Sequence, residues 1–248
     1  MMVDSLREAS KKLILALDVD DAGYALELVE KFRDHVGIFK VGLELYNAAG
    51  PDIVRKIHRQ NCKVFLDLKF HDIPTTVAKA SVVAAREGVF MFNVHASGGF
   101  EMMKRCREDV VTACLKENID RPRIIAVTVL TSMSHETLKS ELGVQHSLKT
   151  HVRHLAGLAL KAGLDGVVSS AEEAEFVRGH CGRGFLIVCP GIRPLWSAKN
   201  DQERVMTPAR AVSAGADYLV MGRAILSHSD PLRAAEMTLQ EIAGGDGA

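Results

Sequence analysis

The sequence lacks the features that mark secreted, membrane-bound and nucleic-acid-binding proteins. Its 31 Lys and Arg residues are balanced by 31 Asp and Glu residues, so bulk charge favours neither nucleic acid nor a membrane surface as a partner. Residues 1–12 are charged and lack the apolar segment of a secretion signal, and no apolar run approaches membrane-spanning length. The five cysteines include no Cys-x-x-Cys pair, and an odd count fits a reducing compartment. The sequence therefore predicts a cytoplasmic protein with no membrane or nucleic-acid partner.

The chain also lacks any sign of a domain boundary. No linker, low-complexity segment or sharp change of composition interrupts its 248 residues, and no sequence repeat stands out. A hydrophobic content of 47% is enough for one large core. We therefore expect a single domain over residues 1–248, with its core at about residues 13–243.

What is present is a regular alternation of apolar runs and helical patterns. Near-continuous apolar runs are typical of strands that are buried on both faces of a parallel sheet. The expected strands cover residues 13–19, 38–43, 63–69, 91–96, 123–130, 166–169, 185–189 and 218–221. Eight strand–helix units predict a (β/α)8 TIM barrel. An open doubly wound sheet is the alternative, but it usually has fewer strands, and no Gly-x-Gly-x-x-Gly follows the first run.

Charged residues gather at the ends of the first three expected strands. Asp67 and Lys69 are two residues apart in the third strand, so they share a face, and Asp72 follows just beyond the strand. Asp18 ends the first strand, and Lys40 lies within the second. Because active sites of this fold lie at the carboxyl ends of the strands, we expect these charges to converge.

Buried charges are costly unless they are paired, and here their signs alternate. A structural ion pair is one interpretation. The other is a site of fixed charges that stabilises charge developing in a transition state. His71 and His95, which lie near strand ends, are interpreted as packing or supporting residues.

A second candidate site follows the last two strands, where this fold commonly binds phosphate. Arg193 comes after the seventh strand, and Gly222 and Arg223 come after the eighth. Glycine allows close backbone approach to an anion, and arginine offers a bidentate fork. The long polar loop at 194–206 is either an insertion or a lid, and Gln202 within it is a candidate phosphate ligand on closure. The residues alone thus indicate a barrel enzyme that acts on a small phosphorylated substrate.

The segment Asp67-x-Lys69-x-x-Asp72-Ile73-Pro74-x-Thr76 closely resembles the signature of the orotidine 5′-phosphate decarboxylase family. Further segments resemble the bacterial form, in the family order, at residues 15–18, 39–42, 127–133, 190–193 and 220–223. The core of the signature alone is shared with a wider superfamily. The family usually has Asn where this chain has Thr75, which leaves open any role of an amide there.

The resemblance implies decarboxylation of orotidine 5′-monophosphate to UMP with neither a metal nor an organic cofactor. Lys69 would stabilise a C6 carbanion and then protonate it, and Asp67 would lie beside the departing carboxylate. Asp18 and Lys40 would bind the ribose hydroxyls. The remaining implied contacts are Thr131 with the pyrimidine, and Gln202, Gly222, Arg223 and Arg193 with the phosphate. In a homodimer, Asp72 and Thr76 would reach the partner's site.

Three other functions stay open at this point. A metal-dependent relative, such as hexulose-phosphate synthase, would carry an acidic residue near the position of Lys40, and a lysine would repel Mg²⁺. A Schiff-base aldolase needs a lysine that loses its proton readily, which Asp67 and Asp72 oppose. A non-catalytic phosphate- or nucleotide-binding barrel would not need every charged position that this chain retains.

Overall fold

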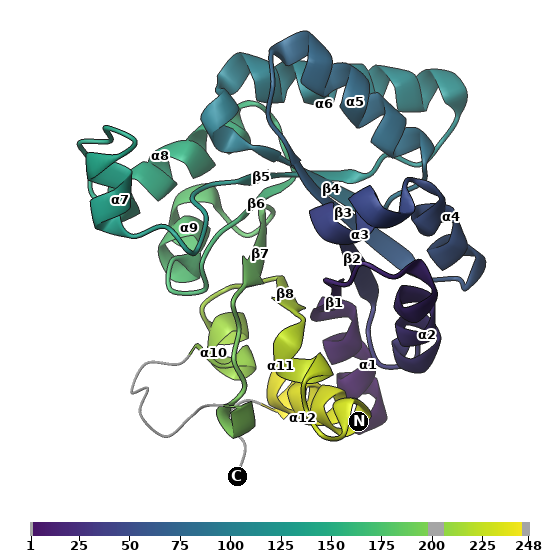
Figure 1. Cartoon of the computed structure of the whole chain (residues 1–248). Coiled ribbons are helices and arrows are strands. Elements are labelled where there is room, and N and C mark those ends of the chain that lie inside the picture. Colours follow the sequence, from purple (N-terminus) through teal and green to yellow (C-terminus); the bar gives the residue numbers. More distant parts are fainter. Residues whose placement is uncertain (1, 198–205, 245–248) are drawn as a thin grey trace. The chain divides into compact units, whose positions relative to one another are not determined.

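The computed structural model describes residues 2–197 and 206–244. Its strands are all parallel and follow one another in chain order around a closed barrel, so the predicted (β/α)8 class is confirmed (Figure 1). The strands are β1 (Leu13–Leu17), β2 (Ile38–Gly42), β3 (Lys63–Phe70), β4 (Met91–His95), β5 (Arg123–Val127), β6 (Gly166–Val168), β7 (Leu186–Pro190) and β8 (Tyr218–Met221).

The chain divides into two compact units. The first unit comprises residues 1–68 and 189–248, and the second comprises residues 69–188. The organisation as one domain over residues 1–248 stays a prediction.

The first unit is discontinuous in sequence. Its helices are α1 (Met2–Lys12), α2 (Ala22–Phe32), α3 (Leu43–Ala49), α4 (Asp52–Arg59), η2 (Leu195–Ser197), α10 (Pro208–Ser213), α11 (Arg223–Leu226) and α12 (Pro231–Gly244). All five residues of β1 are buried, and β1 pairs with β2 on one edge and β8 on the other. The terminal helices α1 and α12 pack against each other (Figure 1). The first and the last helix are therefore neighbours within this unit.

Helix α2 shows how the sequence forms the outer layer. Asp21 caps it by accepting a hydrogen bond from the Tyr24 backbone N–H, and its buried residues recur at helical spacing through Phe32. Tyr24 itself is 49% exposed. It lies four residues before the buried Leu28, but steps of four residues drift by about 40° each around a 3.6-residue helix.

The second unit is continuous. Its helices are α5 (Pro74–Arg86), η1 (Ala96–Gly98), α6 (Phe100–Glu117), α7 (His135–Ser140), α8 (Leu148–Lys161) and α9 (Ala174–Cys181). Helices α5 and α6 lie side by side (Figure 1). At their contact the Cys106 thiol donates to Ser81 Oγ at 3.1 Å, and burial raises the pKa of Cys106 to about 12. This thiol stays protonated and serves as a core residue.

A paired charge joins the amino-terminal ends of β5 and β6. The Arg121 guanidinium donates to both carboxylate oxygens of Asp165 at 2.7 Å, and one of these oxygens also accepts the Ile124 backbone N–H at 2.7 Å. The Asp165 side chain is only 18% exposed. The hydrogen bond with Asp165 is the main cause of a raised Arg121 pKa.

We expect Asp165→Asn to lower the free energy of unfolding by about 2 kcal/mol, because the charge-assisted bonds weaken and one guanidinium donor loses its acceptor. Urea unfolding of the variant and the wild type measures this change. The matched control is Glu117→Gln, which breaks the exposed ion pair between Arg86 and Glu117. It is expected to cost much less than Asp165→Asn, because solvent screens an exposed ion pair. Equal losses in the two variants would contradict the importance assigned to Asp165.

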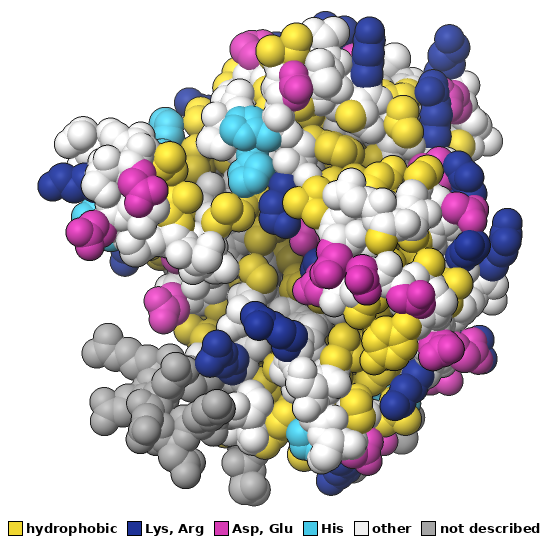
Figure 2. Space-filling model, in the orientation of Figure 1, with side chains coloured by type: hydrophobic (Ala, Val, Ile, Leu, Met, Phe, Trp, Pro, Cys, Tyr) yellow, Lys and Arg dark blue, Asp and Glu magenta, His cyan; other side chains and the backbone are white. Residues whose placement is uncertain are grey.

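The surface matches the balanced composition. Lys, Arg, Asp and Glu side chains are interspersed over the face in Figure 2, and neither sign covers that face. In the described part of the chain no helix is long and apolar enough to cross a membrane. All five cysteines fall within that part and are free thiols.

Candidate active site

The first unit brings three of the predicted charged residues together. The Lys40 Nζ atom lies 2.8 Å from Asp18 Oδ1 and 3.3 Å from Asp67 Oδ2. The side chains of Lys40 and Asp67 are 9% and 12% exposed, whereas that of Asp18 is 55% exposed. The ammonium is thus held between a buried carboxylate and one that faces solvent. The predicted convergence of these three residues is confirmed.

The strand register explains this cluster. Ala16 is the partner of Lys40 across β1 and β2, and Gly42 is the partner of Asp67 across β2 and β3. A Cβ atom on Gly42 would lie 2.9 Å from Lys40 Nζ, so glycine leaves the room that the ammonium occupies. Pairing on two sides lowers the cost of burying Lys40 and Asp67. The exposed Asp18 carboxylate can accept hydrogen bonds from a ligand.

The end of β8 adjoins this cluster. A Cβ atom on Gly222 would lie 3.2 Å from Ala16 Cβ and 3.6 Å from Asp18 Oδ2. Arg223 is exposed and begins α11 directly after Gly222. The segment that the sequence assigned to phosphate therefore starts beside Asp18.

Arg193 is exposed, and its backbone N–H donates to the Met206 carbonyl at 3.2 Å. This bond joins the two ends of the loop that was interpreted as an insertion or a lid. Residues 198–205 of the loop, including Gln202, lie outside the described residues. The assignment of Gln202 stays a prediction.

The second unit contains Lys69, at the carboxyl end of β3. Its φ angle is 52°, in the left-handed region, and its backbone N–H donates to Asn93 Oδ1 at 2.8 Å. Strand β3 runs through Lys69 as predicted, but the positive φ angle of Lys69 departs from the extended geometry on which the shared face of Asp67 and Lys69 was based. Sequence reasoning also assigned no role to Asn93. The sequence signal for Asn93 was that an amide side chain stands among the apolar residues at the start of β4.

Asp72 and Thr76 lie at the start of α5, where Pro74 occupies the first turn as predicted. Both are exposed, and so is Ile73 between them, at 65%. Asp72 Oδ1 accepts the Ile73 backbone N–H at 2.6 Å, which holds the entry into the helix. Two polar side chains and a large apolar one are thus presented together at this helix end.

The remaining candidate site residues of this unit lie at or after the carboxyl ends of β3 to β6. Thr131 is exposed in the turn after β5. The rings of His71 and His95 contact each other, with centroids 5.3 Å apart. Glu173, which sequence reasoning missed, accepts hydrogen bonds from Ser169 Oγ and the Ser170 N–H, and burial raises its pKa. The Ser170-x-x-Glu173 spacing was the available signal, and it indicates a structural turn.

Comparison with known proteins covers almost the whole chain. The family model described as "Orotidine 5'-phosphate decarboxylase / HUMPS family" matches residues 11–238. The chain belongs to this family. All site residues predicted from the sequence fall inside the matched range.

Relatives within the family are similar over their full length. The orotidine 5′-phosphate decarboxylase of Geobacter metallireducens is 52% identical over 240 residues, which is 96% of this chain and 98% of that protein. That of Syntrophotalea carbinolica is 50% identical over 96% of this chain and 97% of the relative. A crystal structure of the Lactobacillus acidophilus enzyme superposes with a TM-score of 0.83 at 36% identity, covering 94% of this chain and 99% of that one.

Proposed function

We propose that this family member is an orotidine 5′-phosphate decarboxylase, which converts orotidine 5′-monophosphate to UMP in pyrimidine biosynthesis. The full-length identity of about 50% to relatives of that name carries the proposal. We also propose that it acts in the cytoplasm, which suits its free cysteines.

The arrangement around Lys40 favours this activity over the metal-dependent branch of the family. The Lys40 ammonium fills the position between the Asp18 and Asp67 carboxylates, 2.8 and 3.3 Å away. A divalent cation bound by these carboxylates would have to displace or approach that positive charge, which is unfavourable. The donor set therefore fits a substrate hydroxyl better than Mg²⁺.

In the proposed reaction the C6–carboxylate bond breaks, CO₂ leaves, and the electron pair stays on C6. The Lys69 ammonium stabilises that carbanion and then donates a proton to C6, which yields UMP and a neutral amine that regains its proton from solvent. An ammonium held against developing charge favours the transition state over the ground state, and only that difference speeds the step. Asp67 is assigned to the side of the departing carboxylate.

Substrate binding is assigned to the other residues. Asp18 and Lys40 take the ribose hydroxyls, and Thr131 takes the pyrimidine. Gly222 and Arg223 take the phosphate, together with Arg193, which precedes the loop, and Gln202 within it. The phosphate is remote from C6, but its binding energy can lower the activation barrier if closure of the loop positions the reacting groups.

We propose that the enzyme acts as a homodimer in which Asp72 and Thr76 contribute to the partner's site. The exposure of both residues beside Ile73, which is 65% exposed, supports this. Both side chains are thus available to contact a second chain.

The test is the loss of orotidine 5′-monophosphate absorbance with protein that has been dialysed against EDTA. Rapid loss without added metal is the expected result. No loss in EDTA, together with Mg²⁺-dependent turnover of a sugar phosphate, would assign the chain to the other branch. No turnover of either substrate, with UMP still bound, would indicate a binding protein.

A further inference from the structure

The backbone of Lys69 is unusual within this molecule. Among the described residues, three that are not glycine have a positive φ angle: Asn61, Lys69 and Asn118. Asparagine tolerates the left-handed region better than other residues, and Asn118 ends helix α6 there. Lysine has no such tolerance, because its Cβ comes too close to the following carbonyl oxygen in this conformation. The surrounding structure must therefore hold Lys69 in place.

Asn93 supplies that hold. It lies in β4, is 1% exposed, and accepts the Lys69 backbone N–H on Oδ1 at 2.8 Å. A buried amide in a strand is costly unless it forms hydrogen bonds. The presence of Asn93 within the apolar run of β4 therefore points to a role for its hydrogen bond. The bond joins the Asn93 side chain in β4 to the backbone of β3 at Lys69, where the φ angle is positive.

We propose that Asn93 is a positioning residue for the reaction, acting by fixing the left-handed backbone of Lys69 and thereby the place of its ammonium. The inference rests on the proposed function, because it assigns Lys69 to the chemical step. A backbone rotation at Lys69 would swing the whole side chain, and a displacement of about 1 Å at a reacting group can cost about 10²-fold in rate. Asn93 would then affect turnover far more than substrate affinity.

The main variant is Asn93→Leu, which keeps the side-chain size and removes the acceptor. We expect kcat to fall by about 10²-fold with KM changed less than about threefold. Asn93→Asp retains an acceptor oxygen and is expected to keep kcat at least about tenfold above that of the leucine variant. Hydrogen–deuterium exchange of the segment containing Lys69 should accelerate in Asn93→Leu and stay slow in Asn93→Asp.

Thr128→Val is the matched control. Thr128 is also buried at the end of a strand, and its hydroxyl donates to the Val168 carbonyl at 3.0 Å. Its loss should lower the urea midpoint of unfolding while kcat and exchange at Lys69 stay at wild-type values. If the leucine variant does not fold, Asn93→Ala takes its place as the variant without an acceptor.

The proposal is overturned if the variant without an acceptor keeps wild-type kcat or wild-type exchange at Lys69. It is also overturned if the aspartate and acceptor-free variants are equally slow, or if Thr128→Val is as slow as they are. Failure of the proposed function gives a different result, because the wild-type protein itself would then leave orotidine 5′-monophosphate unchanged.

Discussion

Lys69→Ala is expected to lower kcat for orotidine 5′-monophosphate by at least about 10⁴-fold. The variant loses both the ammonium that stabilises the C6 carbanion and the proton donor, and effects of each kind are individually about 10²–10⁴-fold. The phosphate and ribose contacts assigned to other residues remain. The loss should therefore appear in kcat, while the affinity for UMP, measured by calorimetric titration, changes much less.

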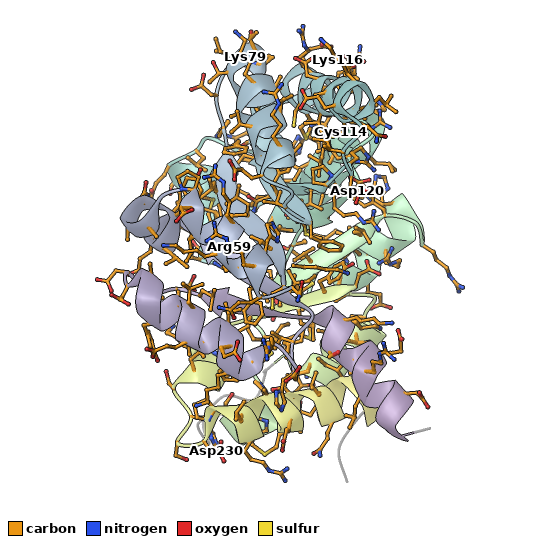
Figure 3. The ribbon with its side chains drawn as sticks, turned by 90° about the vertical axis from the view of Figure 1, so that its right-hand side faces the viewer. Arg59, Lys79, Cys114, Lys116, Asp120 and Asp230 are labelled. Carbon is orange, nitrogen blue, oxygen red and sulfur yellow. The ribbon has the colours of Figure 1, made fainter. Side chains whose placement is uncertain are left out.

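The control for this prediction is Lys79→Ala. Lys79 is an exposed lysine on α5 in the same unit. Its side chain points outward at the top of Figure 3. Removing it changes the net charge by the same amount as Lys69→Ala, and kcat should stay at the wild-type value. Substantial turnover by Lys69→Ala would show that another group protonates C6, and the assignment of Lys69 would then be wrong.

Mixing Asp72→Asn protomers with Lys69→Ala protomers should restore decarboxylation, although each variant alone is expected to be inactive. If Asp72 serves the partner's site, a mixed dimer has one site with both residues intact and one with neither. Random exchange makes about half of the dimers mixed, so about a quarter of wild-type activity is the expected ceiling.

Two differently tagged variants and tandem purification isolate the mixed dimer and measure its activity directly. A control mixture of Lys69→Ala with Lys69→Ala/Asp72→Asn contains no intact Lys69 and must stay inactive. Isolated mixed dimers without activity would contradict a shared site while leaving the assignment of Lys69 untouched. A protein that stays monomeric would contradict the homodimer itself.

The strands were predictable because each is a short apolar run, and a strand inside such a barrel is buried on both faces. The predicted strand ends were wrong where the apolar sequence pattern continues beyond the last residue that pairs with a neighbouring strand. The fifth strand was expected through Leu130 but ends at Val127. Thr128 still pairs with Val168, after which the chain turns and Leu130 is 38% exposed. Composition alone does not reveal where a ladder stops.

Helices α1 and α3 were not predicted. Helix α1 is polar and charged along much of its length, and it is held by its packing on α12, which lies at the other end of the sequence. Helix α3 begins at Leu43 directly after β2, without a loop, so its first residue was counted with the strand. In both cases a tertiary contact or a chain reversal decides the structure, and neither has a local pattern.

The cluster around Lys40 could be predicted because three charged residues stood in or next to apolar runs that neighbour each other in the barrel. The backbone of Lys69 could not be predicted, since lysine has no preference for a positive φ angle. The hydrogen bond from its backbone N–H goes to Asn93, which is 24 residues away in sequence. The details of the site thus depend on contacts between strands, whereas its location depends on strand order.

The discontinuous first unit has a consequence for synthesis on the ribosome. Residues 69–188 form a continuous unit that is complete while the chain is still growing. Strand β1 has to wait, because its partner β8 is made roughly 200 residues later, and α1 waits still longer for α12. Until then a wholly apolar strand presents an open edge, the kind of surface that pairs with other chains. This edge of β1 therefore stays unpaired until β8 has been translated.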